Sequence, residues 1–317
     1  MEPIDQIHIR TLTLNPAFDL HYQMEMLRLE QENYAESVTR DAGGKGINTA
    51  RALTVNGVKC TAWVVLGCDN AAEFEQKLCA DRLPYRAVYV PGAIRENLTI
   101  HPARGGETRI SLDHFAVTPE AMQALSEQLL PIAANSVLSF AGRIPKGVTA
   151  DEVCAFLTTL SDAGTRLVID SNSLTAAQLR RIHPMLIKPN ESELAALCRD
   201  VPGTDPSDPS GCAYRLAQKG LAEQVLVTLG GRGAVYSDGA RLLRIGCPKI
   251  QPVSTIGAGD SVVAGFLAAW VQHAPVEEIL RTAAAWGSAA CLTEGTRPPR
   301  PAEIQTLRPQ IHVAEIG

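Results

Sequence analysis

The chain has 317 residues, of which 45% are hydrophobic and 20% charged, and its formal net charge is −5 at pH 7. This is ordinary globular composition, and the length suffices to bury a large core. The acidic balance argues against nucleic-acid binding, which usually shows a basic patch. No apolar run reaches the ~18 residues of a membrane span, and Met1–Gln6 does not resemble a signal peptide, so we expect a cytoplasmic protein without a membrane partner.

Apolar, β-rich runs alternate with helical patterns along most of the chain. In chain order we expect strand 7–14, helix 46–56, strand 60–66, helix 71–81, strand 85–90, helix 119–133, short strands 137–141, 166–170 and 185–188 separated by helices, strand 223–229, a hairpin of 234–237 and 241–245, and helices 259–273 and 276–291. This alternation predicts an α/β fold, with a mostly parallel sheet and helices on both faces.

Two segments interrupt the alternation. Residues 33–40 and 97–112 show strand-like polar alternation without an intervening helix, and 104–107 is a turn within the second segment. Such strands cannot all join a parallel core. We therefore expect a small β-flap beside the sheet, a candidate lid.

The strongest motif is 254–261, which leads into an apolar helix. Its small residues Gly257, Ala258 and Gly259 let backbone amides approach a ligand, and the amides at a helix N-terminus favour anions. Asp260, placed there, can accept a proton from a hydroxyl. Such a segment suits phosphoryl transfer to an alcohol. The alternative is a glycine turn capped by an aspartate.

A second glycine-rich segment, 41–48, also leads into a helix. Gly43 and Gly44 open the backbone, and Lys45 and Asn48 can face a polar ligand. The alternative is a glycine-rich turn between a strand and a helix.

A third segment, 187–193, lies at a predicted strand end, where α/β sheets bind ligands. Asn190 and Glu193 offer oxygen atoms that suit Mg²⁺ held through water. The alternative is that Asn190 only caps the following helix.

Three further residues are candidates for sugar and phosphate binding. Asp19 follows the first strand and can bind sugar hydroxyls, although an aspartate in a turn is more often structural. Arg95 and Arg109 fall on the two halves of the flap, where paired guanidinium groups suit a phosphate dianion. Taken alone, they would be solvated surface charges.

The order of these motifs resembles the phosphofructokinase B branch of the ribokinase-like sugar kinases over nearly the whole chain. The residues that carry the resemblance are 11–19, 43–48, Arg95–Asn97, Lys188–Glu193, Thr228–Gly230, Gly233–Ala234, 254–261, 287–290 and 295–296. The resemblance implies a ribokinase-like three-layer α/β/α sandwich with a mostly parallel sheet and a small β-sheet lid. It also implies ATP and Mg²⁺.

Residue roles follow from the same resemblance. Asp260 would be the catalytic base, with the γ-phosphate over Gly257, Ala258 and Gly259. The substrate would contact Asp19, Gly43, Gly44, Lys45, Asn48, Arg95, Asn97 and Arg109. The nucleotide would contact Lys188, Asn190, Thr228, Gly230, Gly233 and Ser288, and Asn190 and Glu193 would hold Mg²⁺ through water. We expect residues 1–317 to form one kinase domain, whose lid comprises about 20–41 and 92–114 and pairs two chains into a homodimer.

The substrate is expected to be a ketohexose monophosphate, converted to a bisphosphate. A lysine at position 45 resembles the 1-phosphofructokinase and tagatose-6-phosphate kinase members of the family. An arginine at position 109 resembles the lid of the 6-phosphofructokinase members. Arg143 stands where the family has a small residue. We expect fructose 1-phosphate first, with tagatose 6-phosphate and fructose 6-phosphate as rivals. A ribokinase-type kinase of an unphosphorylated sugar or nucleoside, and a non-catalytic sugar-binding relative, are the remaining alternatives.

Overall fold

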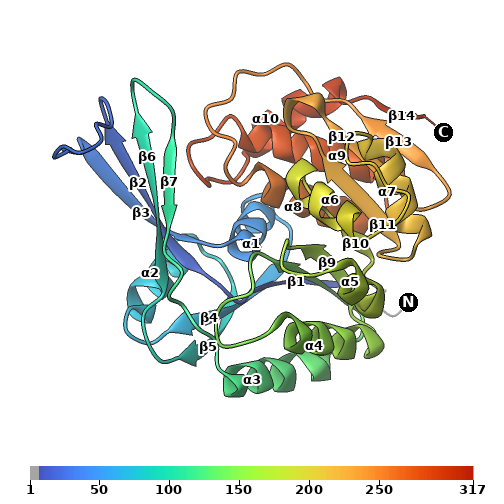
Figure 1. The fold of residues 1–317 in the computed structure, drawn as a ribbon, viewed down its shortest axis with the longest axis horizontal. Coiled ribbons are helices and arrows are strands. Elements are labelled where there is room, and N and C mark those ends of the chain that lie inside the picture. Colours follow the sequence, from blue (N-terminus) through green and yellow to red (C-terminus); the bar gives the residue numbers. More distant parts are fainter. Residues whose placement is uncertain (1–6, 317) are drawn as a thin grey trace.

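A computed structural model describes residues 7–316 and places ten strands in one large sheet. Their order across the sheet is β14-β13-β12-β11-β10-β9-β8-β1-β4-β5 (Figure 1). The bounds are β1 His8–Thr13, β4 Cys60–Gly67, β5 Tyr85–Val90, β8 Ser136–Ala141, β9 Arg166–Asp170, β10 Leu186–Ile187, β11 Gln224–Thr228, β12 Ala234–Ser237, β13 Leu242–Ile245 and β14 Val313–Glu315. No helix among residues 7–316 is long and apolar enough to cross a membrane.

The strands from β11 to β5 pair in parallel, and β12, β13 and β14 add an antiparallel edge. The chain builds outward from β1 through β4 to β5, and then returns to the other side of β1 to build β8, β9, β10 and β11. The strand order therefore reverses between β1 and β8. Open α/β sheets bind ligands at the carboxyl ends of the strands at such a reversal.

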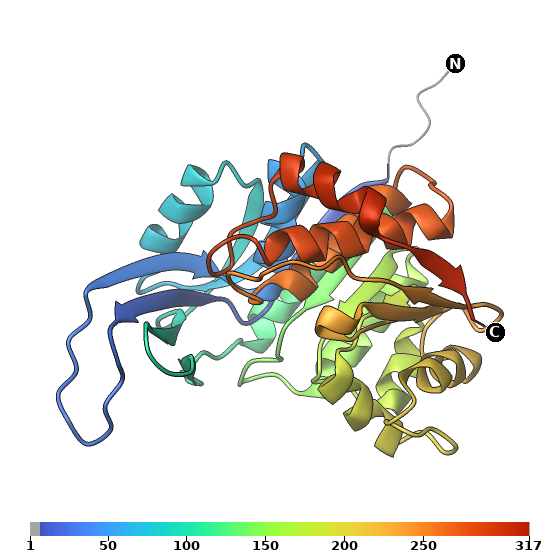
Figure 2. The ribbon, with the colours of Figure 1, turned by 90° about the horizontal axis from the view of Figure 1, so that it is seen from above.

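Helices cover both faces of this sheet (Figure 2). One face carries α1 Lys45–Val55, α2 Ala71–Ala80, α8 Ala258–Trp270, α9 Val276–Ala290 and α10 Pro301–Leu307. The other face carries α3 Pro119–Leu129, α4 Ala150–Asp162, α5 Ala176–Ile182, α6 Glu191–Arg199 and α7 Pro209–Gln218. Most residues of the inner strands β4, β8, β9 and β11 are apolar and buried, as expected for parallel strands covered on both faces. The predicted three-layer α/β/α sandwich is confirmed.

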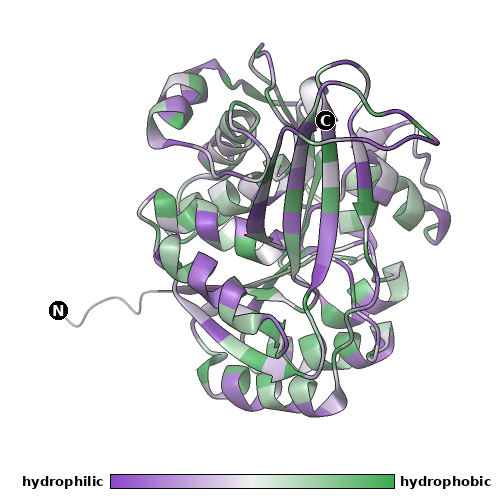
Figure 3. Ribbon diagram, turned by 90° about the vertical axis from the view of Figure 1, so that its left-hand side faces the viewer, coloured by the Kyte–Doolittle hydropathy of each residue, from purple (hydrophilic) through white to green (hydrophobic). Residues whose placement is uncertain are grey.

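A second sheet of four strands stands beside the large one, in the order β3-β2-β6-β7 (Figure 1). Its strands are β2 Ala17–Met24, β3 Ser37–Gly43, β6 Arg95–Pro102 and β7 Thr108–Ser111. Hydrophobic and hydrophilic residues alternate along these strands (Figure 3), as they do where one face of a sheet packs inward and the other faces out. The expected separate small sheet is therefore present.

The structure differs from the sequence prediction mainly in this small sheet. Asp19 lies in strand β2 and not in a turn, because Pro16 ends the link from β1 and the residues after it alternate. The strand expected over 33–40 begins only at Ser37. The helix expected over 119–133 ends at Leu129, where a 3₁₀ turn that contains Pro131 follows.

Candidate active site

The N-terminus of α8 is a partly exposed set of backbone donors. Gly257 is the residue before the helix, adopts a left-handed conformation with φ of 77°, and offers no side-chain cap. By contrast, Thr118, Thr149, Thr175 and Asn190 cap α3, α4, α5 and α6 with side-chain oxygens. The first amides of a helix have no intrahelical acceptor, so the uncapped end of α8 is suited to an anion.

Asp260 lies in the first turn of α8 and is 6% exposed. Asn48 Nδ2 on α1 donates a hydrogen bond of 2.9 Å to Asp260 Oδ2, and Thr49 Oγ1 donates to the Asp260 carbonyl at 3.3 Å. Burial, and next the nearby Asp170 carboxylate, raise the pKa of Asp260 to about 7. A carboxyl with this pKa can gain and lose a proton near neutral pH.

Asp170 ends strand β9 and is the centre of a charged cluster. Its Oδ1 lies 3.0 Å from Lys45 Nζ and 3.4 Å from Lys188 Nζ, and its side chain is 1% exposed. Lys45 Nζ also lies 3.5 Å from Glu193 Oε1. Burial disfavours the ionised carboxyl, but the two ammonium groups outweigh it and hold the pKa of Asp170 below its ordinary value.

Asn190 and Glu193 form a capping box at the start of α6. Asn190 Oδ1 accepts from the Glu193 amide at 2.9 Å, and Glu193 Oε2 accepts from the Asn190 amide at 2.9 Å. The capping role considered from the sequence is therefore present. Glu193 Oε1 faces Lys45, so the Asp170 and Glu193 carboxylates already share one cation, and such oxygens suit Mg²⁺.

No group of three or more His, Cys, Asp or Glu side chains in the described part of the chain could hold a metal by itself.

Asp19 is the centre of a second cluster, on the small sheet. Asn97 Nδ2 on β6 donates to Asp19 Oδ1 at 2.8 Å, and an Arg109 nitrogen on β7 lies 3.8 Å from the same oxygen. A methyl group added to Gly43 would lie only 1.9 Å from Asp19 Oδ2, so only glycine fits there. Gly44 has φ of 133° and immediately precedes α1, which carries Lys45 and Asn48 to the first cluster.

Arg95 joins this second cluster to the end of β1. Its Nε donates to Asn15 Oδ1 at 2.7 Å, and one terminal nitrogen donates to Asn97 Oδ1 at 2.6 Å. Asn15 lies two residues beyond β1, so Arg95 crosses from the small sheet to the large one. Its guanidinium is held in place by neutral oxygens, and its charge is not matched by a bonded carboxylate.

The remaining predicted nucleotide residues lie along neighbouring elements. Thr228 ends β11 and its amide donates to the Pro189 carbonyl at 3.0 Å, beside Asn190. Gly230 and Gly233 follow in a tight turn with φ of 56° and 88°. Ser288 lies on α9, 7% exposed, with Cys247 as its neighbour. No hydrogen bond or ion pair within residues 7–316 joins Gly230, Gly233 or Ser288 to the Asp170 cluster.

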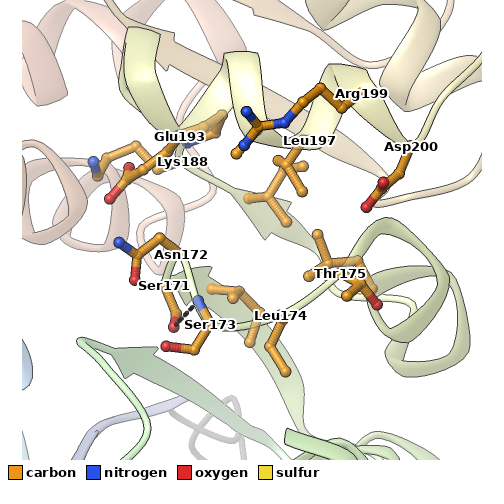
Figure 4. A pocket seen from close by; sticks show the side chains of 15 residues that line it. Ser171, Asn172, Ser173, Leu174, Thr175, Lys188, Glu193, Leu197, Arg199 and Asp200 are labelled. Carbon is orange, nitrogen blue, oxygen red and sulfur yellow. Dashed lines mark hydrogen bonds between the residues drawn. The ribbon is translucent and has the colours of Figure 1, made fainter.

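A pocket of about 250 Å³ borders the first cluster (Figure 4). It lies between the loop after β9 and helix α6, and it shares Lys188 and Glu193 with the charged cluster. Its floor is apolar, and Ser171, Asn172 and Ser173 supply polar groups. Asp260 does not line it, so the pocket is a neighbour of the catalytic candidates and does not contain them.

Asp170 and the placement of Lys45 were missed from the sequence. Strand 166–170 was predicted, and its last residue is an aspartate at the carboxyl end of a parallel strand, which is the signal that could have identified Asp170. Lys45 was assigned to the substrate, yet its ammonium lies between Asp170 and Glu193. A four-carbon side chain can reach either side of its helix, and a motif does not say which.

Three comparisons describe what this chain is similar to. Residues 13–303 match the model of the pfkB family of carbohydrate kinases. The ATP-dependent 6-phosphofructokinase isozyme 2 of Escherichia coli (strain K12) is 31% identical over 294 residues, which are 92% of this chain and 94% of that protein. A 1-phosphofructokinase of Vibrio cholerae is 29% identical over 308 residues, 96% of each chain. The structure of phosphofructokinase-2 from Escherichia coli in complex with substrates and products matches with a TM-score of 0.89 at 29% identity, covering 96% of this chain and 99% of that one.

The raised pKa of Asp260 predicts a pH-dependent stability cost. The unfolded chain ionises this carboxyl near its ordinary pKa of 3.8, whereas the folded chain holds the proton until about pH 7. The cost of ionising it in the fold is therefore absent below about pH 4, grows as the pH rises, and is complete above about pH 7. Asp260→Asn removes this cost. We expect the variant to gain unfolding free energy over the wild type by on the order of a few kcal/mol at pH 8, and much less at pH 4.5.

Urea unfolding at the two pH values measures this difference. Asp208→Asn is the matched control, because Asp208 also lies at a helix start, where it caps α7, a helix that carries no residue of this cluster. A difference between wild type and Asp260→Asn that is the same at both pH values would contradict the raised pKa.

Proposed function

Because the chain belongs to the pfkB family of carbohydrate kinases, we propose that it transfers a phosphoryl group from ATP to a ketohexose monophosphate, giving a bisphosphate, with fructose 1-phosphate as the first candidate substrate. The observation that carries the proposal is the pairing of Asp260 with the uncapped N-terminus of α8. A proton acceptor and an anion site then lie within one helical turn, as phosphoryl transfer to a hydroxyl requires.

Asp260 is the general base in this proposal. Asn48 holds Asp260 Oδ2, so Oδ1 remains to accept the proton of the attacking hydroxyl. The raised pKa makes the carboxyl a stronger base than an exposed aspartate. The proton moves to Asp260 as the hydroxyl oxygen forms its bond to the γ-phosphorus, and ADP leaves with the electron pair of the broken bond.

The charge that develops on the transferred group is met by fixed donors. The amides of Gly257, Ala258 and Gly259 face it at the N-terminus of α8. Lys188 lies close by, because a methyl group added to Gly259 would be 3.3 Å from Lys188 Nζ. Thr228, Gly230, Gly233 and Ser288 are proposed to hold the rest of the nucleotide.

Mg²⁺ fits the carboxylates of Asp170 and Glu193. When bound, it would screen the negative charge of the phosphates. Glu193 would contact it through water, and Asn190 supports Glu193 through the capping box. Lys45 now occupies the space between the two carboxylates, so metal binding requires its ammonium to turn toward the phosphates.

The sugar is proposed to lie between the two sheets, with residues 1–317 as one kinase domain and the small sheet as its lid. Asp19, oriented by Asn97, binds sugar hydroxyls, and Gly43 leaves space for the Asp19 carboxyl. Arg95 and Arg109 bind the phosphate that the sugar already carries. A wrong epimer would leave buried polar groups unpaired, which is how this site would select its substrate.

Fructose 6-phosphate is the second candidate. The Escherichia coli relative named 6-phosphofructokinase isozyme 2 shares 31% identity with this chain. The contact of Lys45 with Asp170 and Glu193, away from Asp19, also weakens the argument for fructose 1-phosphate that was drawn from this lysine.

We also propose that the outer face of the small sheet pairs two chains into a homodimer. Val38 and Ile110 are 54% and 49% exposed there, and Leu98 and Ile100 are half-buried between them. Phe18, on the same face, is fully covered because it packs edge-on against Phe74 of α2. The uncovered apolar half of this face is what a second copy would bury.

Removing the proton acceptor should abolish most turnover. In Asp260→Asn we expect kcat to fall ~10²–10⁴-fold, the usual contribution of a general base, while the Kd for ATP stays within about twofold. Coupled detection of ADP release and calorimetry measure the two quantities, with Asp208→Asn again as the control. Turnover at the wild-type rate would remove Asp260 from the mechanism.

Comparing kcat/KM for fructose 1-phosphate, tagatose 6-phosphate and fructose 6-phosphate at equal ATP tests the substrate. We expect fructose 1-phosphate to be best, and free fructose and nucleosides to be at least ~10²-fold worse, because each charge-assisted contact to a phosphate contributes about 1.5–3 kcal/mol. A value for fructose 1-phosphate more than ~10-fold below either rival would overturn the first choice.

The assembly is tested by sedimentation velocity. We expect a dimer for the wild type and a monomer for Ile110→Asp, which places a charge in the proposed interface. Ile316→Asp is the matched control, because Ile316 is also half exposed, at 46%, but lies beyond β14 at the far end of the large sheet. A wild-type monomer at micromolar concentration would exclude pairing through the lid.

A further inference from the structure

Arg143 occupies the point where the strand order reverses. It lies two residues beyond β8, and the β1–β8 register pairs Leu12 with Phe140. Because the two strands are parallel neighbours, the loops that follow them, which carry Asn15 and Arg143, leave the sheet at the same edge. Asn15 is the residue that holds Arg95. The β8 loop therefore brings a third arginine to the ligand crevice, opposite the small sheet.

The backbone around Arg143 is fixed. Gly142 has φ of 101°, donates its amide to the Asp170 carbonyl at 3.0 Å, and accepts from Ser171 Oγ at 2.6 Å. On the other side, the Ile144 amide donates to Ser173 Oγ at 3.1 Å. Arg143 itself is exposed, and its side chain makes no hydrogen bond or ion pair with any residue from 7 to 316. A rigid loop thus presents an unpaired guanidinium.

The charges nearby do not balance. Asp19 faces Arg109, and Asp113 faces Lys146 at 3.8 Å. Arg95 and Arg143 are left without a carboxylate of their own in the described part of the chain. Burial lowers the pKa of Arg95, the Asp19 carboxylate partly opposes this, and the positive charges of Arg143 and Arg109 lower it further. Like charges held together in this way are costly unless an anion binds, and a phosphate carries −1.5 to −2 charges at pH 7.

We propose that Arg143 is a specificity-determining residue, which binds the phosphate already present on the substrate together with Arg95 and Arg109. The inference rests on the proposed function, and it names the group that the substrate must carry. Because Arg95 and Arg109 belong to the small sheet and Arg143 to the large one, one phosphate joins the two sheets. The same phosphate therefore both identifies the substrate and draws the lid against the large sheet.

The test uses Arg143→Ser and a matched control, Arg181→Ser. Arg181 is also an exposed arginine without a bonded partner within residues 7–316, but it lies on α5. Binding of inorganic phosphate is measured by calorimetry in the presence of a saturating non-hydrolysable ATP analogue, so that the N-terminus of α8 is already occupied. We expect Arg143→Ser to weaken phosphate binding about 10- to 100-fold, Arg143→Lys to retain part of it, and Arg181→Ser to leave it unchanged.

Kinetics supply the second readout. Arg143→Ser should raise KM for the preferred sugar phosphate about 10- to 100-fold and leave KM for ATP within about twofold, because the lost contact is to the sugar phosphate. The double variant with Arg95→Ser should weaken phosphate binding by less than the product of the two single effects, since both arginines contact one phosphate.

The outcomes separate this inference from the proposed function. Phosphate binding by Arg143→Ser equal to that of the wild type, or no phosphate binding by the wild type itself, would overturn the role of Arg143. Loss of phosphate binding in Arg143→Ser, in a chain that phosphorylates none of the three ketohexose phosphates, would support the phosphate site while the proposed reaction fails.

Discussion

Two carboxylates, Asp170 and Asp260, are buried close together. The arrangement of the site depends on which of the two is balanced by a positive charge. Lys45 and Lys188 both contact Asp170, so Asp170 stays ionised. The burial of Asp260 and the negative charge of Asp170 then raise the pKa of Asp260. That division creates one strong proton acceptor beside one anchored anion. A single buried carboxylate would be either fully paired and inert, or unpaired and protonated. The pair divides these roles, because Lys45 at the start of α1 and Lys188 just after β10 form their ion pairs with Asp170.

The reversal of strand order brings these groups within reach of a sugar. Asn15 follows β1, Arg143 follows β8 and Asp170 ends β9, so three adjacent parallel strands deliver polar residues to one edge. The small sheet grows out of the same edge, because only three residues separate β1 from β2. Asp19 and Arg95 are therefore held opposite the strand ends by short connections.

The sequence predicted what depends on local pattern. The alternating strands and helices, and the glycines before α1 and α8, required only periodicity and backbone chemistry. Asp19 was misplaced in a turn because Asn15-Pro16 resembles a turn, whereas its extended conformation is set by pairing with β3 and β6. Asp170 was overlooked because a lone aspartate after four strand residues is unremarkable until two lysines from distant segments are seen to surround it. Contacts of this kind depend on tertiary packing, which local pattern does not encode.

The small sheet also has a consequence for how the chain is made. Its central strand β2 pairs with β3 a short distance along the chain, but in parallel with β6, which follows only after β4, α2 and β5. A chain emerging from the ribosome thus displays β2 and β3 as a two-stranded hairpin, which is at best marginally stable in water. The second edge of β2 remains unpaired until β6 has been synthesised. Synthesis must therefore pass through an interval in which this unpaired edge is open to association with other chains.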